Sequence, residues 1–237
     1  MKKIDIRQKL EEMGVSQDSI VLGDFDAIGR FTAERTRDRN SPLYKSVGAF
    51  YRSNYERGIL IYHLISKYKL SSMLEIGFGR GYSSVCAAKA FHDNGIDGRI
   101  VTIDPNFDQN FIRGLQTVFP RQWFECIKFM QGTSKEVLPS INEKFDFVYI
   151  DGDHSYEATK FDWEATKDKY NKFLLFDDYH LPDKNDPGIQ CQKLIDEIED
   201  DSKELIIMDR RMFFDDRRLK DEEINYGQVL LAKKENL

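Results

Sequence analysis

The stretch Phe145-Asp-Phe-Val-Tyr-Ile-Asp-Gly-Asp-His-Ser-Tyr-Glu157 changes abruptly in character at its centre. Its residues up to Ile150 are mostly apolar or aromatic, and such residues favour a β-strand. Asp151, Asp153 and His154 then follow within four positions. A buried strand that ends in carboxylates and an imidazole brings titratable groups to the carboxyl edge of a sheet, where open α/β sheets bind their ligands. The stretch therefore predicts an α/β fold with an active site beyond this strand.

A second run of the same kind lies further along the chain. Lys172-Phe-Leu-Leu-Phe176 reads as a strand, and it is followed directly by Asp177, Asp178, Tyr179 and His180. If the two strands are neighbours, their ends bring four carboxylates and two histidines together. Such a group indicates an active site that holds a metal ion.

From about residue 70, short apolar runs alternate with helical patterns, which is typical of βαβ units in a doubly wound, mainly parallel sheet. Apolar stripes at helical spacing occupy 61–68 and 191–198, and a thinner one occupies 158–165. The charged segment 209–227 lacks a strong helix pattern, so the last two strands are expected to pair antiparallel. The candidate strands are Ser72–Ile76, Arg99–Ile103, Cys126–Met130, Phe145–Ile150, Lys172–Phe176, Glu204–Met208 and Gln228–Ala232.

The composition fits one domain of ordinary size. The chain has 237 residues, of which 41% are apolar, enough for a single large core. Its net charge of −6 and its scattered basic residues disfavour nucleic-acid binding. No apolar run is long enough for a membrane span or a secretory signal. Three cysteines without metal-ligand spacing indicate reduced thiols, so we expect a cytoplasmic protein, and a homo-oligomer is compatible with the sequence.

Residues 1–55 are expected to form a cap over the ligand edge of the sheet, separate from the main domain at 56–237. They contain scattered Gly, Ser and Asp, and show little periodicity beyond a short helix at Ile4–Met13. Several aromatic and basic residues in this polar segment either pack the cap or form a wall that excludes water from the site. They are Tyr44, Lys45, Phe50, Tyr51 and Tyr55.

A strand, a glycine turn and a helix start are combined in Ser72-Met-Leu-Glu-Ile-Gly-Phe-Gly-Arg-Gly-Tyr-Ser-Ser84. Gly77, Gly79 and Gly81 permit positive φ and let a ligand approach the backbone closely. Their G-x-G-x-G spacing differs from the G-x-G-x-x-G of dinucleotide-binding turns, which disfavours a nicotinamide-dependent oxidoreductase. The next strand ends at Asp104, where an acid commonly holds a ribose diol.

Two motifs resemble those of the class I S-adenosylmethionine-dependent methyltransferases: Glu75-Ile-Gly-Phe-Gly-Arg-Gly81 is similar to the first and Thr102-Ile-Asp-Pro105 to the second. The resemblance covers roughly residues 56–237 and implies a seven-stranded, Rossmann-like sheet whose last strand is antiparallel. It also implies that the glycine turn faces the methionine portion of the cofactor and that Asp104 faces the ribose. The expected cofactor-binding residues are Glu75, Gly77, Gly79, Gly81, Asp104, Ser134 and Asp151.

The contact to adenine departs from the family pattern. In Gly132-Thr-Ser-Lys-Glu136, Thr133 stands where many family members carry an acid beside the adenine. The arrangement of a glycine, a small residue and a serine is similar to the catechol O-methyltransferases. This similarity makes Ser134 the candidate adenine contact.

The segment Ile150–Glu157 resembles the metal-dependent O-methyltransferases, in particular the branch acting on sugars of macrolide antibiotics. The resemblance implies that Asp151, Asp177 and Asp178 bind the metal and that His154 is the general base. Three carboxylates suit a hard, octahedral cation, which favours Mg²⁺ over Zn²⁺. Asp153 is expected to support the site or to interact with the following helix.

The sequence therefore predicts an S-adenosylmethionine-dependent, Mg²⁺-assisted O-methyltransferase acting on a small hydroxylated molecule, such as a sugar or a diol. Two alternatives remain open. A cofactor-binding protein without catalysis is one. The other is a metal-dependent oxygenase, because the cephalosporin hydroxylases carry similar motifs and His154, His180 and Asp151 could form a facial iron site. Each acid also has a structural reading, as a turn residue or a helix cap, and His154 could instead cap the helix that follows it.

Overall fold

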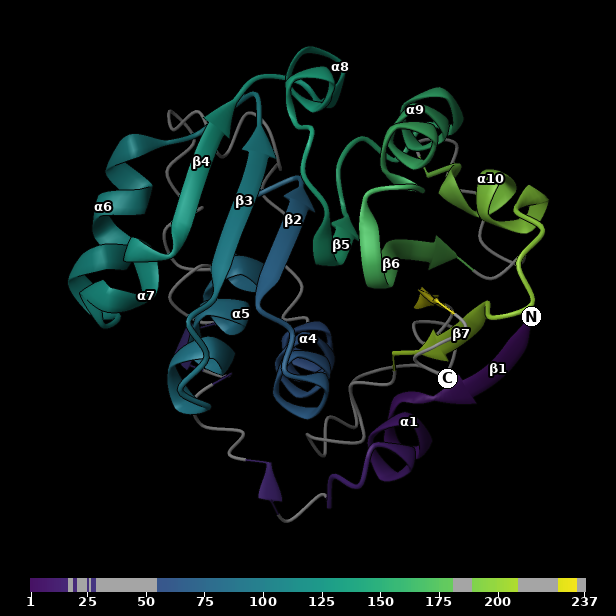
Figure 1. Ribbon diagram of the computed structural model, residues 1–237, viewed down its shortest axis with the longest axis horizontal. Helices are drawn as coiled ribbons and strands as arrows, with labels where there is room; N and C mark the ends of the chain where they lie inside the picture. The colour runs from purple at the N-terminus through teal and green to yellow at the C-terminus, as the bar shows by residue number, and fades with distance from the viewer. Residues whose placement is uncertain are drawn as a thin grey trace, which may run out of the picture.

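A computed structural model describes residues 1–16, 19–20, 25, 27–28, 55–180, 189–208 and 226–233. These residues form an eight-stranded sheet with helices on both faces (Figure 1). The strands are β1 (Lys2–Asp5), β2 (Ser72–Ile76), β3 (Arg99–Asp104), β4 (Ile127–Gln131), β5 (Phe145–Ile150), β6 (Tyr170–His180), β7 (Glu204–Ile207) and β8 (Tyr226–Ala232). The sheet order is β1-β7-β8-β6-β5-β2-β3-β4. This architecture confirms the predicted α/β class.

All seven predicted strands are present, and six of them have ends that differ by at most two residues. The strand predicted as Lys172–Phe176 is longer, because β6 continues through the residues predicted to follow it as far as His180. β8 pairs antiparallel with both β7 and β6, which confirms the predicted antiparallel connection. β1 is an eighth strand that the sequence does not predict, and it pairs in parallel with β7 at the edge of the sheet. Its short polar sequence buries only Ile4, and an ion pair of 2.9 Å joins Lys2 to Glu204 of β7. A strand with so little apolar pattern gives no periodic signal.

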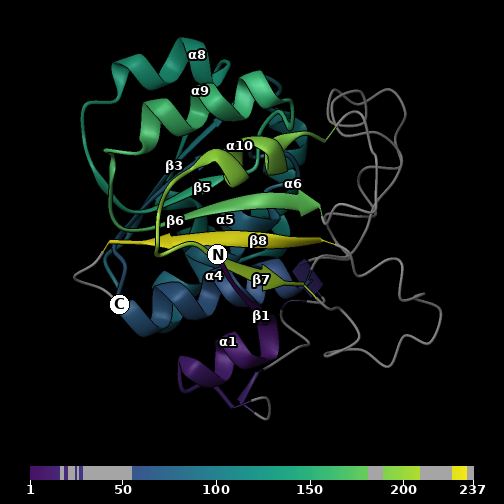
Figure 2. The ribbon, with the colours of Figure 1, turned by 90° about the vertical axis from the view of Figure 1, so that its right-hand side faces the viewer.

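Helices cover the two faces of the sheet in separate groups. Figure 2 shows α8, α9 and α10 on one side of the sheet and α4 and α1 on the other. The apolar stripes predicted over 61–68, 158–165 and 191–198 lie in α4, α9 and α10. The helices are α1 (Ile6–Glu12), α4 (Tyr55–Tyr68), α5 (Tyr82–Asp93), α6 (Gln109–Val118), α7 (Arg121–Glu125), α8 (Ser134–Val137), α9 (Tyr156–Thr166) and α10 (Cys191–Glu197), with a 3₁₀ turn at Leu138–Ser140.

The strand β5 shows why the opening stretch is apolar on consecutive positions. Phe147 and Tyr149 pack into the core on the side of α4 and α5, whereas Val148 and Ile150 pack into the core on the other side. A strand covered on both faces is apolar on consecutive positions, as β5 is from Phe147 to Ile150. The strand β5 thus contributes side chains to the apolar cores on both faces of the sheet.

Most of the predicted N-terminal cap, including Tyr44 and Tyr51, lies outside the described residues. The described part consists mainly of β1 and α1, which lie at the β7 edge of the sheet. The predicted short helix is present as α1. The cap over the ligand edge stays a prediction.

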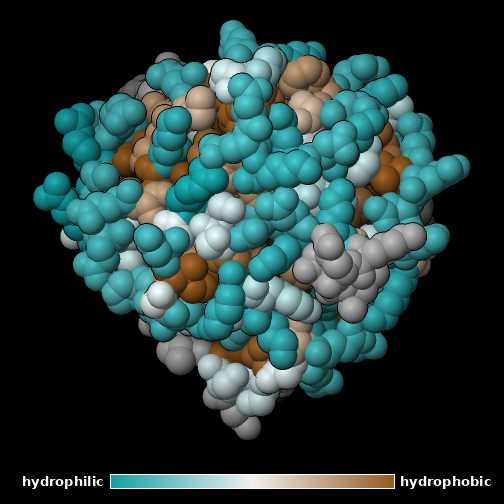
Figure 3. Space-filling view, in the orientation of Figure 1, coloured by the Kyte–Doolittle hydropathy of each residue, from teal (hydrophilic) through white to brown (hydrophobic). Residues whose placement is uncertain are grey.

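The surface seen in Figure 3 is mainly hydrophilic, with apolar residues in small separate patches. Among the described residues, only Met1 and Val118 are large apolar side chains with high exposure. None of the described helices has the length and the apolar content needed to span a bilayer.

Strand register places the predicted site residues level with one another. Ile76 of β2 pairs with Ile103 of β3 and with Ile150 of β5, and Ile150 pairs with Phe176 of β6. The chain order reverses between β2 and β5, which is the topological switch point where such sheets bind ligands. The next residues after these paired positions therefore lie in one row at the carboxyl edge: Gly77, Asp104, Asp151 and Asp177.

Candidate active site

A cavity of about 940 Å³ lies along this edge of the sheet. Its wall combines residues from the glycine turn, from the ends of β3 and β5, and from the starts of α8 and α9. Most of the predicted cofactor and catalytic residues line it. They include Gly77, Gly79, Asp104, Ser134, Asp151 and His154.

Two positions of the glycine turn, Gly77 and Gly81, are packed too closely for a side chain. Gly77 has φ of 93°, and a Cβ at this position would lie 2.0 Å from the carbonyl oxygen of Asp151. Gly81 has φ of 74° and begins α5 without a side-chain cap. The turn thus brings bare backbone to the cavity, as close approach of a ligand requires.

Asp104 is fixed by two backbone donors. Its Oδ2 accepts a hydrogen bond of 2.9 Å from the Gly79 N–H, and its Oδ1 accepts one of 2.7 Å from the Asn106 N–H. The side chain lines the cavity. Because a carboxylate has about four acceptor sites, Asp104 can also accept hydrogen bonds from a ligand.

Glu75 lies behind the glycine turn, and it is not among the described residues that line the cavity. It is fully buried and accepts hydrogen bonds from the hydroxyls of Ser83, Ser84 and Thr102. Burial raises the pKa of the Glu75 carboxyl, and these hydroxyls oppose the rise. Glu75 therefore ties the start of α5 to β2 and β3, and its predicted contact with the cofactor stays a prediction.

The two acids near the end of β6 lie where the strand is irregular, and their side chains have different environments. The pairing of β6 with β8 shifts register between Phe176 and Tyr179, and Asp178 has φ of 50°. A bulge of this kind turns a side chain and is common beside active sites. Asp178 lines the cavity, whereas the side chain of Asp177 is fully buried.

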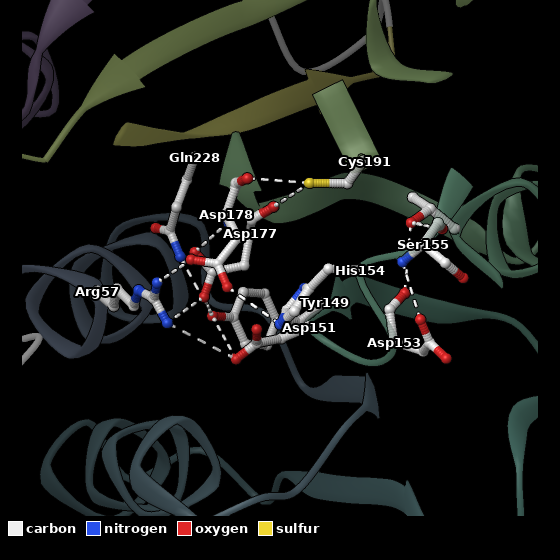
Figure 4. Close-up of polar contacts among 11 residues, drawn as sticks. Arg57, Tyr149, Asp151, Asp153, His154, Ser155, Asp177, Asp178, Cys191 and Gln228 are labelled. Carbon is white, nitrogen blue, oxygen red and sulfur yellow. Dashed lines mark hydrogen bonds and ion pairs between the residues drawn. The ribbon is translucent and has the colours of Figure 1, made fainter. Parts of the chain in front are cut away.

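Arg57, from the first turn of α4, binds three carboxylates, which we call the acidic group: Asp151, Asp177 and Asp178. Its Nη1 lies 2.7 Å from Asp177 Oδ2 and 3.9 Å from Asp151 Oδ2, and its Nη2 lies 2.5 Å from Asp178 Oδ1 (Figure 4). The side chain is 14% exposed. No motif surrounds Arg57 in the sequence, so only the packing of α4 against the sheet reveals this contact.

Tyr149 and Gln228 complete the environment of Asp177. The Tyr149 hydroxyl donates a hydrogen bond of 2.5 Å to Asp177 Oδ2, and Gln228 Nε2 donates one of 3.2 Å to the Tyr149 oxygen (Figure 4). Burial and the neighbouring carboxylates raise the pKa of Tyr149 well above its usual value. Tyr149 therefore stays protonated and acts as a donor.

Ionisation of all three carboxylates would give the acidic group more negative charge than Arg57 can neutralise. Burial raises the pKa of Asp151 well above its usual value, the neighbouring Asp177 raises it further, and Arg57 opposes the rise. Burial likewise raises the pKa of Asp177. Three carboxylates face one guanidinium, so the ionised group has an excess charge that a divalent cation would offset.

Asp151, His154 and Asp178 form a group suited to a metal ion. One ligand atom from each lies within 4.8 Å of the others, and His154 Nε2 is 3.2 Å from Asp178 Oδ2. Oxygen atoms that share a cation lie about 2.0–2.6 Å from it, so this spacing fits a small ion. Asp177, predicted as a ligand, is bound instead to Tyr149 and Arg57, and its metal role stays a prediction. The side chain of His180 lies outside the described residues.

Asp153 stabilises the corner that follows β5, which comprises residues 151–155. Its Oδ1 accepts a hydrogen bond of 2.8 Å from the Ser155 N–H, which lowers the pKa of Asp153. Ser155, and not His154, is the N-cap of α9, because its side chain accepts a hydrogen bond from the Ala158 N–H. The capping role that the sequence left open for His154 thus belongs to Ser155.

Ser134 begins α8 and lines the cavity beside Asp162 of α9. The sequence analysis missed Asp162. It is 1% exposed, and burial raises its pKa to about 6, a rise that a hydrogen bond with Ser134 opposes. It lies four residues after Ala158 on α9, and both residues line the cavity.

Comparisons with known proteins give a family match for part of the chain and a relative with a similar sequence. Residues 74–179 match the family described as a methyltransferase domain. Caffeoyl-CoA O-methyltransferase 2 from Petunia hybrida is 30% identical over 104 residues, which cover 41% of this chain and 41% of the plant protein. The chain thus matches less than half the length of that curated relative.

Solved structures share the fold over nearly the whole chain. The O-methyltransferase TomG from Streptomyces achromogenes, solved with S-adenosylmethionine, has a TM-score of 0.57 at 16% identity and 96% coverage of both chains. An O-methyltransferase from Bacillus cereus, solved with S-adenosylhomocysteine, has a TM-score of 0.55 at 16% identity, covering 96% of this chain and 97% of the other. At such identities the likeness shows the fold alone. Residues 74–179 thus match a methyltransferase-domain family, and the chain shares the α/β fold of these solved methyltransferases.

Proposed function

We propose that this protein is an S-adenosylmethionine-dependent O-methyltransferase that uses a divalent cation and acts on a hydroxyl of a small molecule. The observation that carries the proposal is one cavity lined both by the glycine turn with Asp104 and by Asp151, His154 and Asp178. The first set suits a nucleoside cofactor, and the second suits a hydroxyl that must lose its proton. The methyltransferase domain match supports this reading.

In this proposal, Asp151 and Asp178 would hold the cation. Their carboxylates are 23% and 17% exposed and face the cavity, and hard oxygen ligands favour Mg²⁺. The cation would lower the pKa of the acceptor hydroxyl and orient it. Asp177 would act indirectly, by fixing the position of Arg57 through their ion pair. Tyr149 would orient the Asp177 carboxylate through its hydrogen bond.

The residues of the chain would then align the reactants. The glycine turn would seat the methionine portion, and Asp104 would accept hydrogen bonds from the ribose hydroxyls. The acceptor oxygen forms its bond to the methyl carbon while the carbon–sulfur bond breaks, so alignment of the three atoms is the main requirement. His154, 33% exposed beside Asp178, would take the hydroxyl proton. The products are a methyl ether and S-adenosylhomocysteine.

The acceptor that we propose is a sugar unit or a catechol-like diol. Two neighbouring hydroxyls suit a cation that orients one of them for transfer.

The three thiols, two of them buried, support the reduced, cytoplasmic setting that the sequence predicts.

The test is calorimetry together with a chelation assay. S-adenosylhomocysteine is expected to bind with or without EDTA, because its proposed contacts lie at the glycine turn and Asp104. Transfer of labelled methyl from S-adenosylmethionine to a panel of catechols and hydroxylated sugars is expected to stop in EDTA and to return with excess Mg²⁺. Absence of S-adenosylhomocysteine binding would refute the proposed function. Full transfer in EDTA would refute its metal dependence.

His154→Ala is expected to lower turnover by about 10²–10⁴-fold, because a positioned general base contributes about that much. The affinity for S-adenosylhomocysteine and for Mn²⁺, read by electron paramagnetic resonance, should stay near the wild-type value. His92→Ala is the matched control, since His92 is 47% exposed and lies outside the cavity. Loss of Mn²⁺ binding in His154→Ala would make His154 a ligand and not the base.

A further inference from the structure

Asp162 is a buried carboxylate in the wall of the cofactor cavity that the proposed reaction does not use. It comes from the middle of α9, which packs against α8. The side chain is 1% exposed, and its Oδ1 has no hydrogen-bond partner among the described residues. A buried acceptor left without a donor costs free energy, so a ligand that supplies the donor is favoured.

The position of Asp162 identifies the part of the ligand that would meet it. Gly77 and Asp104 occupy the wall where β2 and β3 end, which suits the methionine and ribose portions. Asp162 lies in the wall formed by α8 and α9, together with Ser134 and Ala158. Its Oδ2 lies 3.5 Å from the point that a Cβ on Gly152 would occupy, so Asp162 packs beside the corner that follows β5. The base of the nucleoside is the remaining portion of the cofactor.

We propose that Asp162 recognises the adenine of the cofactor by accepting a hydrogen bond from its exocyclic amino group. This inference rests on the proposed function, because it concerns the same cofactor. An ionised carboxylate can only accept, so it favours an amino group and disfavours a carbonyl oxygen at the same position. Asp162 would therefore distinguish adenine from hypoxanthine. It would supply from α9 an acid in place of the one that many members of the similar family carry where Thr133 stands in this chain.

The experiment compares two ligands, S-adenosylhomocysteine and S-inosylhomocysteine, by calorimetry. Wild-type protein is expected to bind the adenine compound at least about tenfold more tightly, since a site built for one hydrogen-bonding group rejects the opposite group strongly. Asp162→Asn offers both a donor and an acceptor, so the preference should fall at least about fivefold. Glu164→Gln, an exposed acid on the same helix that pairs with Lys167, is the control and should keep the preference.

The outcomes separate this inference from the proposed function. If wild type binds neither compound, the proposed function fails. If it binds S-adenosylhomocysteine but a folded Asp162→Asn keeps the wild-type preference, only the role of Asp162 is overturned. A crystal structure of the wild-type complex gives a reading that does not depend on how the variant folds. It is expected to show the Asp162 carboxylate within hydrogen-bonding distance of the adenine amino group, and an adenine turned away from Asp162 would overturn the inference.

Discussion

Asp151→Asn is expected to lower turnover by at least about 10³-fold, since loss of a metal ligand removes several kcal/mol of stabilisation from the reacting oxygen. Asn keeps the shape of the side chain but removes its charge. The affinity for Mn²⁺ should fall with turnover, whereas the affinity for S-adenosylhomocysteine should stay similar. Electron paramagnetic resonance, calorimetry and the methyl-transfer assay measure the three quantities.

Asp153→Asn is the matched control for this variant. Asp153 is an exposed acid two residues along the same corner, and its carboxylate is engaged with the Ser155 N–H. It should retain Mn²⁺ binding and most of the turnover. If both variants lose turnover equally, the corner as a whole is needed and Asp151 has no special role. If Asp151→Asn keeps its turnover, the proposed cation does not act through Asp151.

Sequence could identify Asp104 and Asp151 because strand ends are readable from a one-dimensional pattern. Each follows an apolar run, and parallel strands carry their carboxyl ends to one edge. The register then places both level with Gly77, as the pairings of Ile76 with Ile103 and Ile150 show. The fold class and the antiparallel last strand follow from the same patterns.

The direction of individual side chains could not be read in the same way. Asp177 and Asp178 are adjacent in sequence, and only the path of β6 through its irregular part shows that Asp178 lines the cavity and Asp177 is buried. Arg57 and Asp162 lie on helices whose patterns report only a buried stripe. A polar residue beside that stripe reaches the site only if the helix packs in the right orientation. The sequence pattern of one helix does not give that orientation.

Arg57→Met is expected to destabilise the protein by about 3–5 kcal/mol when divalent cations are removed, because it leaves a buried charge without its partner. Asp177 is the charge at stake, since its side chain is fully buried and lies 2.7 Å from Arg57. Urea unfolding in EDTA near pH 7.5 measures the loss. Arg121→Met is the control, because Arg121 is 87% exposed and its ion pair with Glu125 spans 3.8 Å, so its loss should be small.

The pH dependence distinguishes a charge effect from a packing defect. Arg57 lowers the pKa of Asp177, so its removal raises that pKa further above the usual 3.8. A carboxyl with a raised pKa in the folded state is tolerated when protonated and destabilises the fold as pH rises. The deficit of Arg57→Met should therefore be largest at neutral pH and shrink as pH falls toward 4. A deficit that is independent of pH would indicate lost packing of the arginine side chain.

A second substitution and a cation should each restore part of the loss. Asp177→Asn in the Arg57→Met background removes the unpaired charge, so the double variant should be more stable than Arg57→Met alone. Mg²⁺ should also stabilise Arg57→Met more than wild type, because Asp178 contacts Arg57 and belongs to the proposed metal group. If Mg²⁺ stabilises both proteins equally, Arg57 and the cation act on separate charges, and the acidic group is not the shared site that its geometry indicates.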